Sequence, residues 1–132
     1  MKITTPVSAG ELVDKITILD IKSVKVKDKK KLSQVMHELN LLQSKYDNLK
    51  ISGGSKEKLT ALRKQLLKIN TALWNIEDTL RKLELNKDFG KLFISKARSV
   101  YIINDKRFMV KNKINILLGS DINEVKEYKK YR

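Results

Sequence analysis

The chain has 132 residues, which suits one domain, and 41% of them are hydrophobic, which is enough to bury a core. The absence of cysteine excludes disulfide bonds, thiolate metal sites and cysteine nucleophiles. One proline and five glycines are too few for an all-β fold with many turns. The 29 basic and 15 acidic residues leave a formal net charge of +14.

This positive charge is mostly lysine. Of the 29 basic residues, 24 are lysine and five are arginine, whereas proteins that read phosphates or bases usually favour arginine for its bidentate fork. The excess is spread over the chain, with +4 in residues 1–31, +3 in residues 32–85 and +7 in residues 86–132. We interpret most of it as a solvated lysine surface and keep adhesion to nucleic acid or acidic surfaces as an alternative.

Targeting signals and membrane segments are not recognisable in the sequence. Residues 1–6 lack the roughly 7–15-residue apolar core of a signal peptide. The apolar runs, such as residues 114–119, are far too short to span a bilayer. We therefore expect a cytoplasmic protein with no membrane partner.

The first predicted helix covers about residues 9–26. Ser8 and Glu11 form an S-x-x-E capping box at its start, and Val7 and Leu12 stand at the positions of a hydrophobic staple. Apolar residues cover most of the surface of this helix. We therefore expect other helices on two of its sides.

Two heptad patterns follow, separated by residues 52–55, Ser-Gly-Gly-Ser. The first runs from Leu32 to Leu49 and the second from Leu59 to Leu83, with spacings that alternate between three and four residues. Two apolar seams joined by a short polar loop predict a long antiparallel hairpin with coiled-coil-like packing over residues 32–85. The second helix of this hairpin is the longer one, so its end needs a further partner.

A fourth helix is predicted over about residues 89–118, with Asp88 as its cap and Gly119 as its stop. A short last helix is predicted over about residues 121–130, because Glu124 follows Asp121 by three residues. The predicted fold class is therefore an all-α helical bundle in a single domain, residues 1–132. It has four main helices and a short C-terminal helix.

Signatures of metal sites and of hydrolases are absent. The single histidine, His37, has no H-E-x-x-H partner, and the glycine pair near residue 53 does not precede a phosphate-loop Lys-Ser or Lys-Thr. No strand–turn–helix elbow presents a serine nucleophile. We therefore predict no catalytic residue, no metal and no cofactor, and we lean against an enzyme.

Polar residues on the inward faces of three predicted helices form the first candidate site. Its members can meet in one zone: Asp14, Lys15, Trp74, Glu77, Asp78, Arg81, Arg98, Tyr101, Asn104 and Asp105. One interpretation is an internal network of salt bridges and hydrogen bonds that fixes the register of the helices. The other is a pocket for a small anionic ligand, with Lys15, Arg81 and Arg98 binding its oxygens.

A second candidate surface lies on the fourth predicted helix. Four of its basic residues can follow a phosphate backbone: Lys106, Arg107, Lys111 and Lys113. Tyr128 and Tyr131 are candidates for base stacking. No helix-turn-helix, zinc finger or aromatic-rich sheet accompanies them, so the same residues can equally form a solvated face.

Three segments resemble a family of small bacterial proteins that carries a label of unknown function. They are GELVDKITILDIK at residues 10–22, LWNIED at residues 73–78 and NDKR at residues 104–107. The resemblance covers most of the chain and implies no activity or site residue. The chain is also loosely similar to the helical chorismate mutases, but those need arginines around a dicarboxylate, and the opening helix here has Lys15 and no arginine.

Three functions follow in rank order. The first is a small helical interaction or scaffold protein, as a homodimer or with a protein partner, because the heptad seams can continue between chains. The second is a binding protein for nucleic acid or a small anionic ligand. The third is a small helical enzyme.

Overall fold

The computed structural model describes residues 1–132 and contains four α-helices and no strand. Helix α1 spans Ala9–Lys25, α2 spans Lys29–Asp47, α3 spans Gly53–Leu85 and α4 spans Lys91–Leu118. The prediction of an all-α helical fold is confirmed. None of the four helices combines the length and the apolar character that crossing a bilayer requires.

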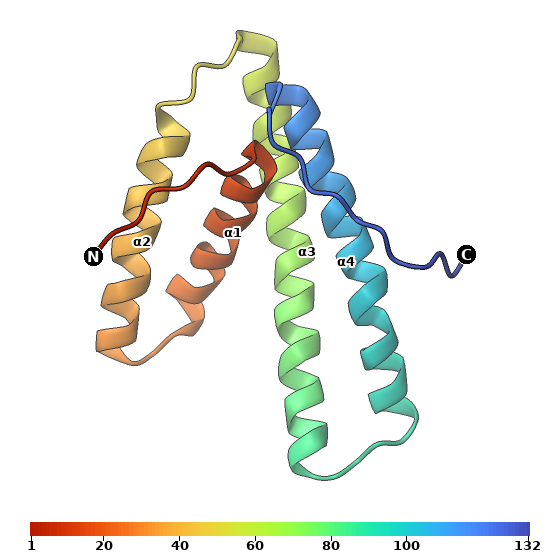
Figure 1. The fold of residues 1–132 in the computed structure, drawn as a ribbon. Coiled ribbons are helices and arrows are strands. Elements are labelled where there is room, and N and C mark those ends of the chain that lie inside the picture. The colour runs from red at the N-terminus through yellow and green to blue at the C-terminus, as the bar shows by residue number, and fades with distance from the viewer.

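The four helices form two antiparallel hairpins, α1 with α2 and α3 with α4 (Figure 1). Helix α1 also packs against both α3 and α4, so it lies between α2 and the other hairpin. This position explains the composition of α1, in which Val13, Ile16, Leu19 and Ile21 are all buried. A helix that is covered on two sides needs apolar residues around most of its circumference.

The helix pairing differs from the hairpin predicted for residues 32–85. The backbones of α2 and α3 do not pack against each other. The two helices meet through Arg63 of α3, which donates a hydrogen bond to Gln43 of α2 (2.9 Å) and lies over the ring of Tyr46. Coiled-coil packing of α2 on α3 is therefore absent.

The leucine seam of α3 faces α1 and α4 instead. Leu59 and Leu66 are buried in one cluster with Val13 of α1 and with Val110 and Ile114 of α4. Heptad spacing specifies an apolar stripe along a helix, but it does not specify which helix covers that stripe. Helix α1 buries more apolar surface than α2, none of whose residues is buried, and it occupies the place predicted for α2.

The short helix predicted over residues 121–130 does not form, and this segment runs extended beside α4 (Figure 1). Glu124 and Lys126 both form ion pairs with α4, to Lys111 (3.0 Å) and Asp105 (3.0 Å). Residues two apart point to the same side in an extended chain but not in a helix. The contacts with α4 therefore favour the extended conformation.

The ends of α4 are set by local residues. Gly119 follows the last turn with φ 62°, in the left-handed region where glycine is favoured, so the predicted stop is confirmed. Asp88 lies two residues before the observed N-cap, Gly90, and its carboxylate accepts a hydrogen bond from the Gly90 N–H (3.2 Å). The helix therefore begins at Lys91, slightly later than predicted.

Helices α3 and α4 extend well beyond α1 and α2 (Figure 1). We call this part of the hairpin, residues 72–103, the distal arm. No residue between Glu77 and Met109 is buried, whereas the core lies where α1 crosses α3 and α4. The molecule is thus a small three-helix core with α2 on one side and a two-helix extension at one end.

Candidate functional site

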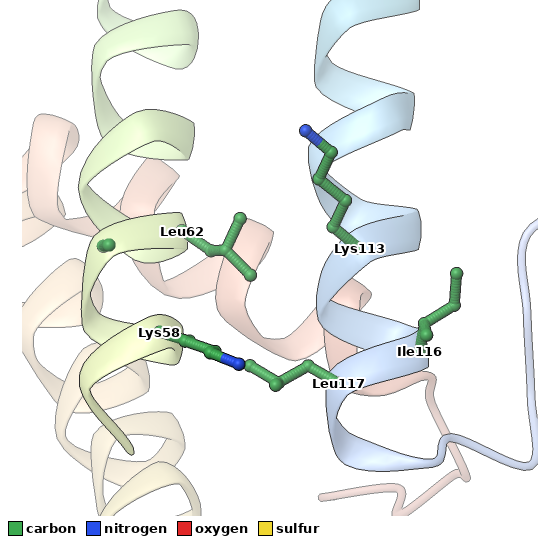
Figure 2. A pocket seen from close by; sticks show the side chains of 6 residues that line it. Lys58, Leu62, Lys113, Ile116 and Leu117 are labelled. Atoms are coloured by element: carbon green, nitrogen blue, oxygen red, sulfur yellow. The ribbon is translucent and has the colours of Figure 1, made fainter. Parts of the chain in front are cut away.

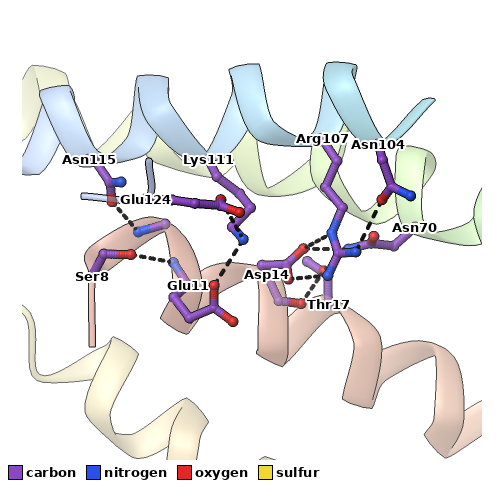
Figure 3. Close-up of polar contacts among 11 residues, drawn as sticks. Ser8, Glu11, Asp14, Thr17, Asn70, Asn104, Arg107, Lys111, Asn115 and Glu124 are labelled. Atoms are coloured by element: carbon purple, nitrogen blue, oxygen red, sulfur yellow. Dashed lines mark hydrogen bonds and ion pairs between the residues drawn. The ribbon is translucent and has the colours of Figure 1, made fainter. Parts of the chain in front are cut away.

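The first turn of α1 lies against the C-terminal half of α4 (Figure 3). Ser8 caps the helix, and its Oγ accepts a hydrogen bond from the Glu11 N–H (3.1 Å). The Gly10 N–H donates to Oδ1 of Asn115 on α4 (2.6 Å). The predicted capping box is therefore half formed, because the Glu11 carboxylate turns to Lys111 of α4 instead (2.8 Å).

Glycine at position 10 allows α1 and α4 to approach closely. A Cβ atom at Gly10 would overlap the carbonyl oxygen of Lys111 in α4. The preceding N–H group, that of Ala9, donates to Oγ of Ser120 (3.2 Å). The N–H groups at the start of α1, which attract anions when free, are thus already bonded within the chain.

Lys111 lies between two carboxylates beside this contact. Its Nζ atom is 2.8 Å from Oε2 of Glu11 and 3.0 Å from Oε2 of Glu124, and 8% of its side chain is exposed. Burial opposes the charged form, but hydrogen bonds to Glu11 and Glu124 and the charge of Asp14 outweigh it and raise the pKa of Lys111. Lys111 therefore stays charged and joins α1, α4 and the C-terminal segment.

One turn further along α1, Asp14 forms the central contact of the site (Figure 3). Its side chain is 1% exposed, and it accepts two hydrogen bonds from Arg107 of α4, from Nε (2.8 Å) and Nη2 (2.5 Å). This is the bidentate geometry in which arginine and carboxylate pair most strongly. The hydrogen bonds to Asp14 raise the pKa of the Arg107 guanidinium.

Three neutral side chains complete this network. The Nδ2 atom of Asn70 on α3 donates to Oδ1 of Asp14 (2.9 Å) and to Oγ1 of Thr17 (2.9 Å). The Thr17 hydroxyl donates to the backbone carbonyl of Asp14 (2.7 Å), and Asn104 accepts from Nη1 of Arg107 (3.4 Å). Residues of α1, α3 and α4 are therefore joined by one set of hydrogen bonds.

The network is closed. No buried side-chain nitrogen or oxygen atom in the chain is left without a hydrogen-bond partner. Unpaired buried polar groups cost free energy, so a network in which each group is bonded favours one arrangement of its helices. The arrangement is suited to fixing the positions of α1, α3 and α4 relative to one another.

The side chains of the chain do not form a cluster of metal ligands. No cluster of three or more histidine, cysteine, aspartate or glutamate residues is close enough to hold an ion. His37, the single histidine, is exposed on α2. The polar side chains that do meet in the site are paired charges and amides.

The structure brings together two of the ten candidate residues of the inward-facing set, Asp14 and Asn104, and joins them through Arg107. Lys15 points away from this network and pairs with Glu38 of α2 (3.2 Å), with both side chains about half exposed. The remaining seven lie on the distal arm or beside the C-terminal segment.

The residues on the distal arm do not converge. Asp78 pairs with Lys82 one turn along α3 (3.3 Å). Trp74 is half-buried, whereas Glu77, Arg81 and Arg98 are exposed and form no ion pair.

Asp105 and Tyr101 hold the C-terminal segment. The Tyr131 hydroxyl donates to Asp105 (2.7 Å), and the rings of Tyr101 and Tyr131 pack edge to face at 5.0 Å. The hydrogen bond from Tyr131, followed by that from Lys126, lowers the pKa of Asp105. The same bond raises the pKa of Tyr131, because the carboxylate favours the protonated hydroxyl.

The four basic residues proposed to follow phosphates have two different environments. Arg107 and Lys111 are held by carboxylates, and their charges are neutralised within the chain. Lys106 and Lys113 are exposed and form no ion pair.

Sequence reasoning did not include Gly10, Asn70 or Asn115 among the site residues. Asn70 interrupts the apolar surface of α3 between Leu66 and Leu73, and this polar residue next to a leucine seam was the available signal. Gly10 and Asn115 carried no such signal, because their role depends on the approach of α1 to α4. The partner of Asp14 was also missed, since Arg107 lies 93 residues away in a lysine-rich segment.

Comparison with known protein families identifies a match over almost the whole chain. The model of the Family of unknown function (DUF6165) matches residues 1–131. No curated protein and no solved structure matches the chain. Because the match covers almost the whole sequence, the chain belongs to this family of unknown function.

Proposed function

We propose that this chain is a helical interaction module that self-associates through its distal arm. The observation that carries the proposal is its exposed surface. A compact monomer of 15.3 kDa exposes about 7,100 Å², whereas this chain exposes 9984 Å². The excess of about 2,900 Å² is more than the roughly 800 Å² that each partner buries in a standard interface.

The distal arm contributes to this excess with apolar side chains. Near the tip of the hairpin, Leu85 is 83% exposed, and Phe89, Leu92 and Ile94 are each at least half exposed. Two helices alone cannot bury an apolar stripe on every side, and a second hairpin packed against the first would complete a four-helix arrangement. The exposed residues therefore support a helical partner.

The charge distribution favours a second copy as that partner. The distal arm carries six basic and four acidic residues, a net charge of +2, whereas the other 100 residues carry +12. Two copies of a chain with net charge +14 repel each other least where their charges are balanced. The arm carries less positive charge per residue than the remainder of the chain taken together, which lowers the electrostatic penalty when two copies meet there.

Sedimentation equilibrium tests the proposal. We expect the unmodified chain to show twice its 15.3 kDa mass. We expect a triple variant, Leu85→Gln, Leu92→Gln and Ile94→Gln, to be monomeric with unchanged helix content by circular dichroism. All three residues are exposed, so their loss affects an interface more than the core.

A matched triple variant removes exposed apolar residues elsewhere. Val24→Gln, Met36→Gln and Val125→Gln lie outside the arm, and the dimer should survive these changes. A chain that is monomeric at its highest soluble concentration contradicts self-association. Equal dissociation of both triple variants contradicts the assignment of the interface to the distal arm.

A further inference from the structure

A groove lies between α3 and α4 at the end of the hairpin opposite the distal arm (Figure 2). Its volume is about 420 Å³. Lys58 and Leu62 reach from α3 toward α4, and Lys113 and Leu117 reach back from α4. The groove is independent of the closed network around Asp14, with which it shares no residue.

The floor of the groove is apolar. It is formed by Ala61 and Leu62 of α3 and by Ile116 and Leu117 of α4. Leu62 and Leu117 are half-buried and pack against the core, whereas Ile116 is 72% exposed. Ile116 therefore adds exposed apolar surface to the groove beside Leu62 and Leu117.

The rim of the groove is basic and uncompensated. Lys58 on one side and Lys113 on the other are exposed, and neither forms an ion pair within the chain. Residues 53–72 of α3 carry five basic residues and one acidic residue, and α4 carries seven and one. The single acidic residue of α4, Asp105, already binds Lys126 and Tyr131. The groove therefore suits an acidic occupant.

We propose that this groove binds an acidic amphipathic helix of another protein. Apolar side chains at positions i, i+3, i+4 and i+7 of that helix would lie on the floor, as in other helix-in-groove complexes. Its carboxylates would flank this stripe and pair with Lys58 and Lys113 on the two sides. The groove is open to solvent along the helices, so it suits one face of a helix better than a small molecule, which needs enclosure.

Two other occupants fit the same surface less well. A second copy of this chain would bring a net charge of +14 to a basic rim, and the like charges would repel. Nucleic acid would find the two lysines but no aromatic ring on which a base could stack, and the floor offers no hydrogen-bonding side chain. Charge and floor chemistry together favour an acidic helix.

Fluorescence anisotropy with a synthetic peptide tests this proposal. The probe is a fluorescein-labelled helical peptide with leucines at i, i+3, i+4 and i+7 and glutamates on both sides of the leucine stripe. We expect saturable binding to the full chain at about 150 mM salt, where long-range attraction is screened. The same peptide with glutamine in place of glutamate should bind at least about tenfold more weakly.

Two charge-reversal variants separate the groove from general electrostatic attraction. Lys58→Glu with Lys113→Glu should weaken binding by about tenfold or more. The matched control, Lys45→Glu with Lys64→Glu, makes the same change in net charge on exposed residues outside the groove, and binding should change by less than about threefold. All four lysines are exposed and unpaired, so both variants should keep the helix content of the parent chain.

Three results would overturn the proposal. They are no binding of the glutamate peptide, an equal loss in the two double variants, and tighter binding of a single-stranded oligonucleotide that the groove variant alone abolishes. The last result would identify a nucleic-acid surface instead. The triple Gln variant of the distal arm should bind the peptide as the parent chain does. Loss of self-association can therefore be distinguished from loss of peptide binding in the groove.

Discussion

Arg107→Met tests how strongly the buried ion pair holds α1 and α4 together. Loss of the guanidinium removes both of its hydrogen bonds to Asp14, at 2.8 and 2.5 Å, and leaves that carboxylate with the bond from Asn70 (2.9 Å). The Asp14 side chain is 1% exposed, so water replaces the lost partner only in part. Breaking one side of a buried ion pair costs about 3–5 kcal/mol. Because Arg107 itself is 28% exposed, we expect a loss of about 3 kcal/mol in the free energy of unfolding.

Urea unfolding followed by far-UV circular dichroism and by Trp74 fluorescence measures this loss. For a chain of this size it corresponds to a fall in melting temperature of about 10 °C. The matched control is Lys15→Met in α1, whose pair with Glu38 is about half exposed on both sides. Exposed pairs contribute little, so the control should cost less than about 1 kcal/mol.

A double variant shows whether Arg107→Met destabilises the chain because it leaves the buried Asp14 carboxylate unpaired or because it removes packing contacts. Asp14→Asn combined with Arg107→Met removes both charges, and it should be more stable than Arg107→Met alone by roughly 1 kcal/mol or more. A single variant that costs no more than the Lys15 control would refute the reasoning. A double variant that is less stable than Arg107→Met would show that packing, not the uncompensated carboxylate, causes the loss.

Two further predictions concern the contact between α1 and α4 and the attachment of the C-terminal segment. Gly10→Ala should lower the free energy of unfolding in urea by about 1–3 kcal/mol, because the added Cβ would overlap the Lys111 carbonyl. Gly54→Ala is the control, because its Cβ would meet open space and should not destabilise the chain. Equal effects of the two changes would contradict the close approach of α1 to α4. Tyr131 should titrate above its ordinary pKa, and Asp105 below its own, in an NMR pH titration. Their hydrogen bond should therefore weaken as the pH rises through the raised Tyr131 pKa or falls through the lowered Asp105 pKa. Asp105→Asn should return Tyr131 to a pKa of about 10, and an unchanged value would exclude the carboxylate as the cause.

Local features of the helices could be predicted from the sequence because they depend on residues close together in the chain. Ser8 caps α1 through an N–H group three residues away, and Gly119 ends α4 through its own backbone conformation. The apolar positions of the helices follow in the same way from their periodicity. The helix expected over residues 121–130 does not form. Its local start signal competes with the ion pairs of Glu124 and Lys126 to α4, and these pairs need an extended chain.

The candidate site was harder to predict, because its chemistry depends on pairs that are distant in sequence. Asp14 was expected in a polar zone, but Arg107 was assigned to a surface that follows phosphates. An arginine in a basic segment can pair with a buried carboxylate or contact phosphates, and in Arg107 the presence of Asp14 decides between the two roles. That partner is present because Gly10 lets α1 come close to α4.

The sequence by itself determined that this basic, cysteine-free chain is all-helical and where its main apolar stripes lie. Only the tertiary structure decided which helices cover those stripes, with α1 packed against α3 and α4 in the place predicted for α2. The physical reason is that an apolar stripe has no preferred partner, since the hydrophobic effect depends on area and not on direction. The choice follows from the close contact at Gly10 and from the directional hydrogen bonds of Asp14, Asn70 and Arg107, which fit one arrangement of the helices.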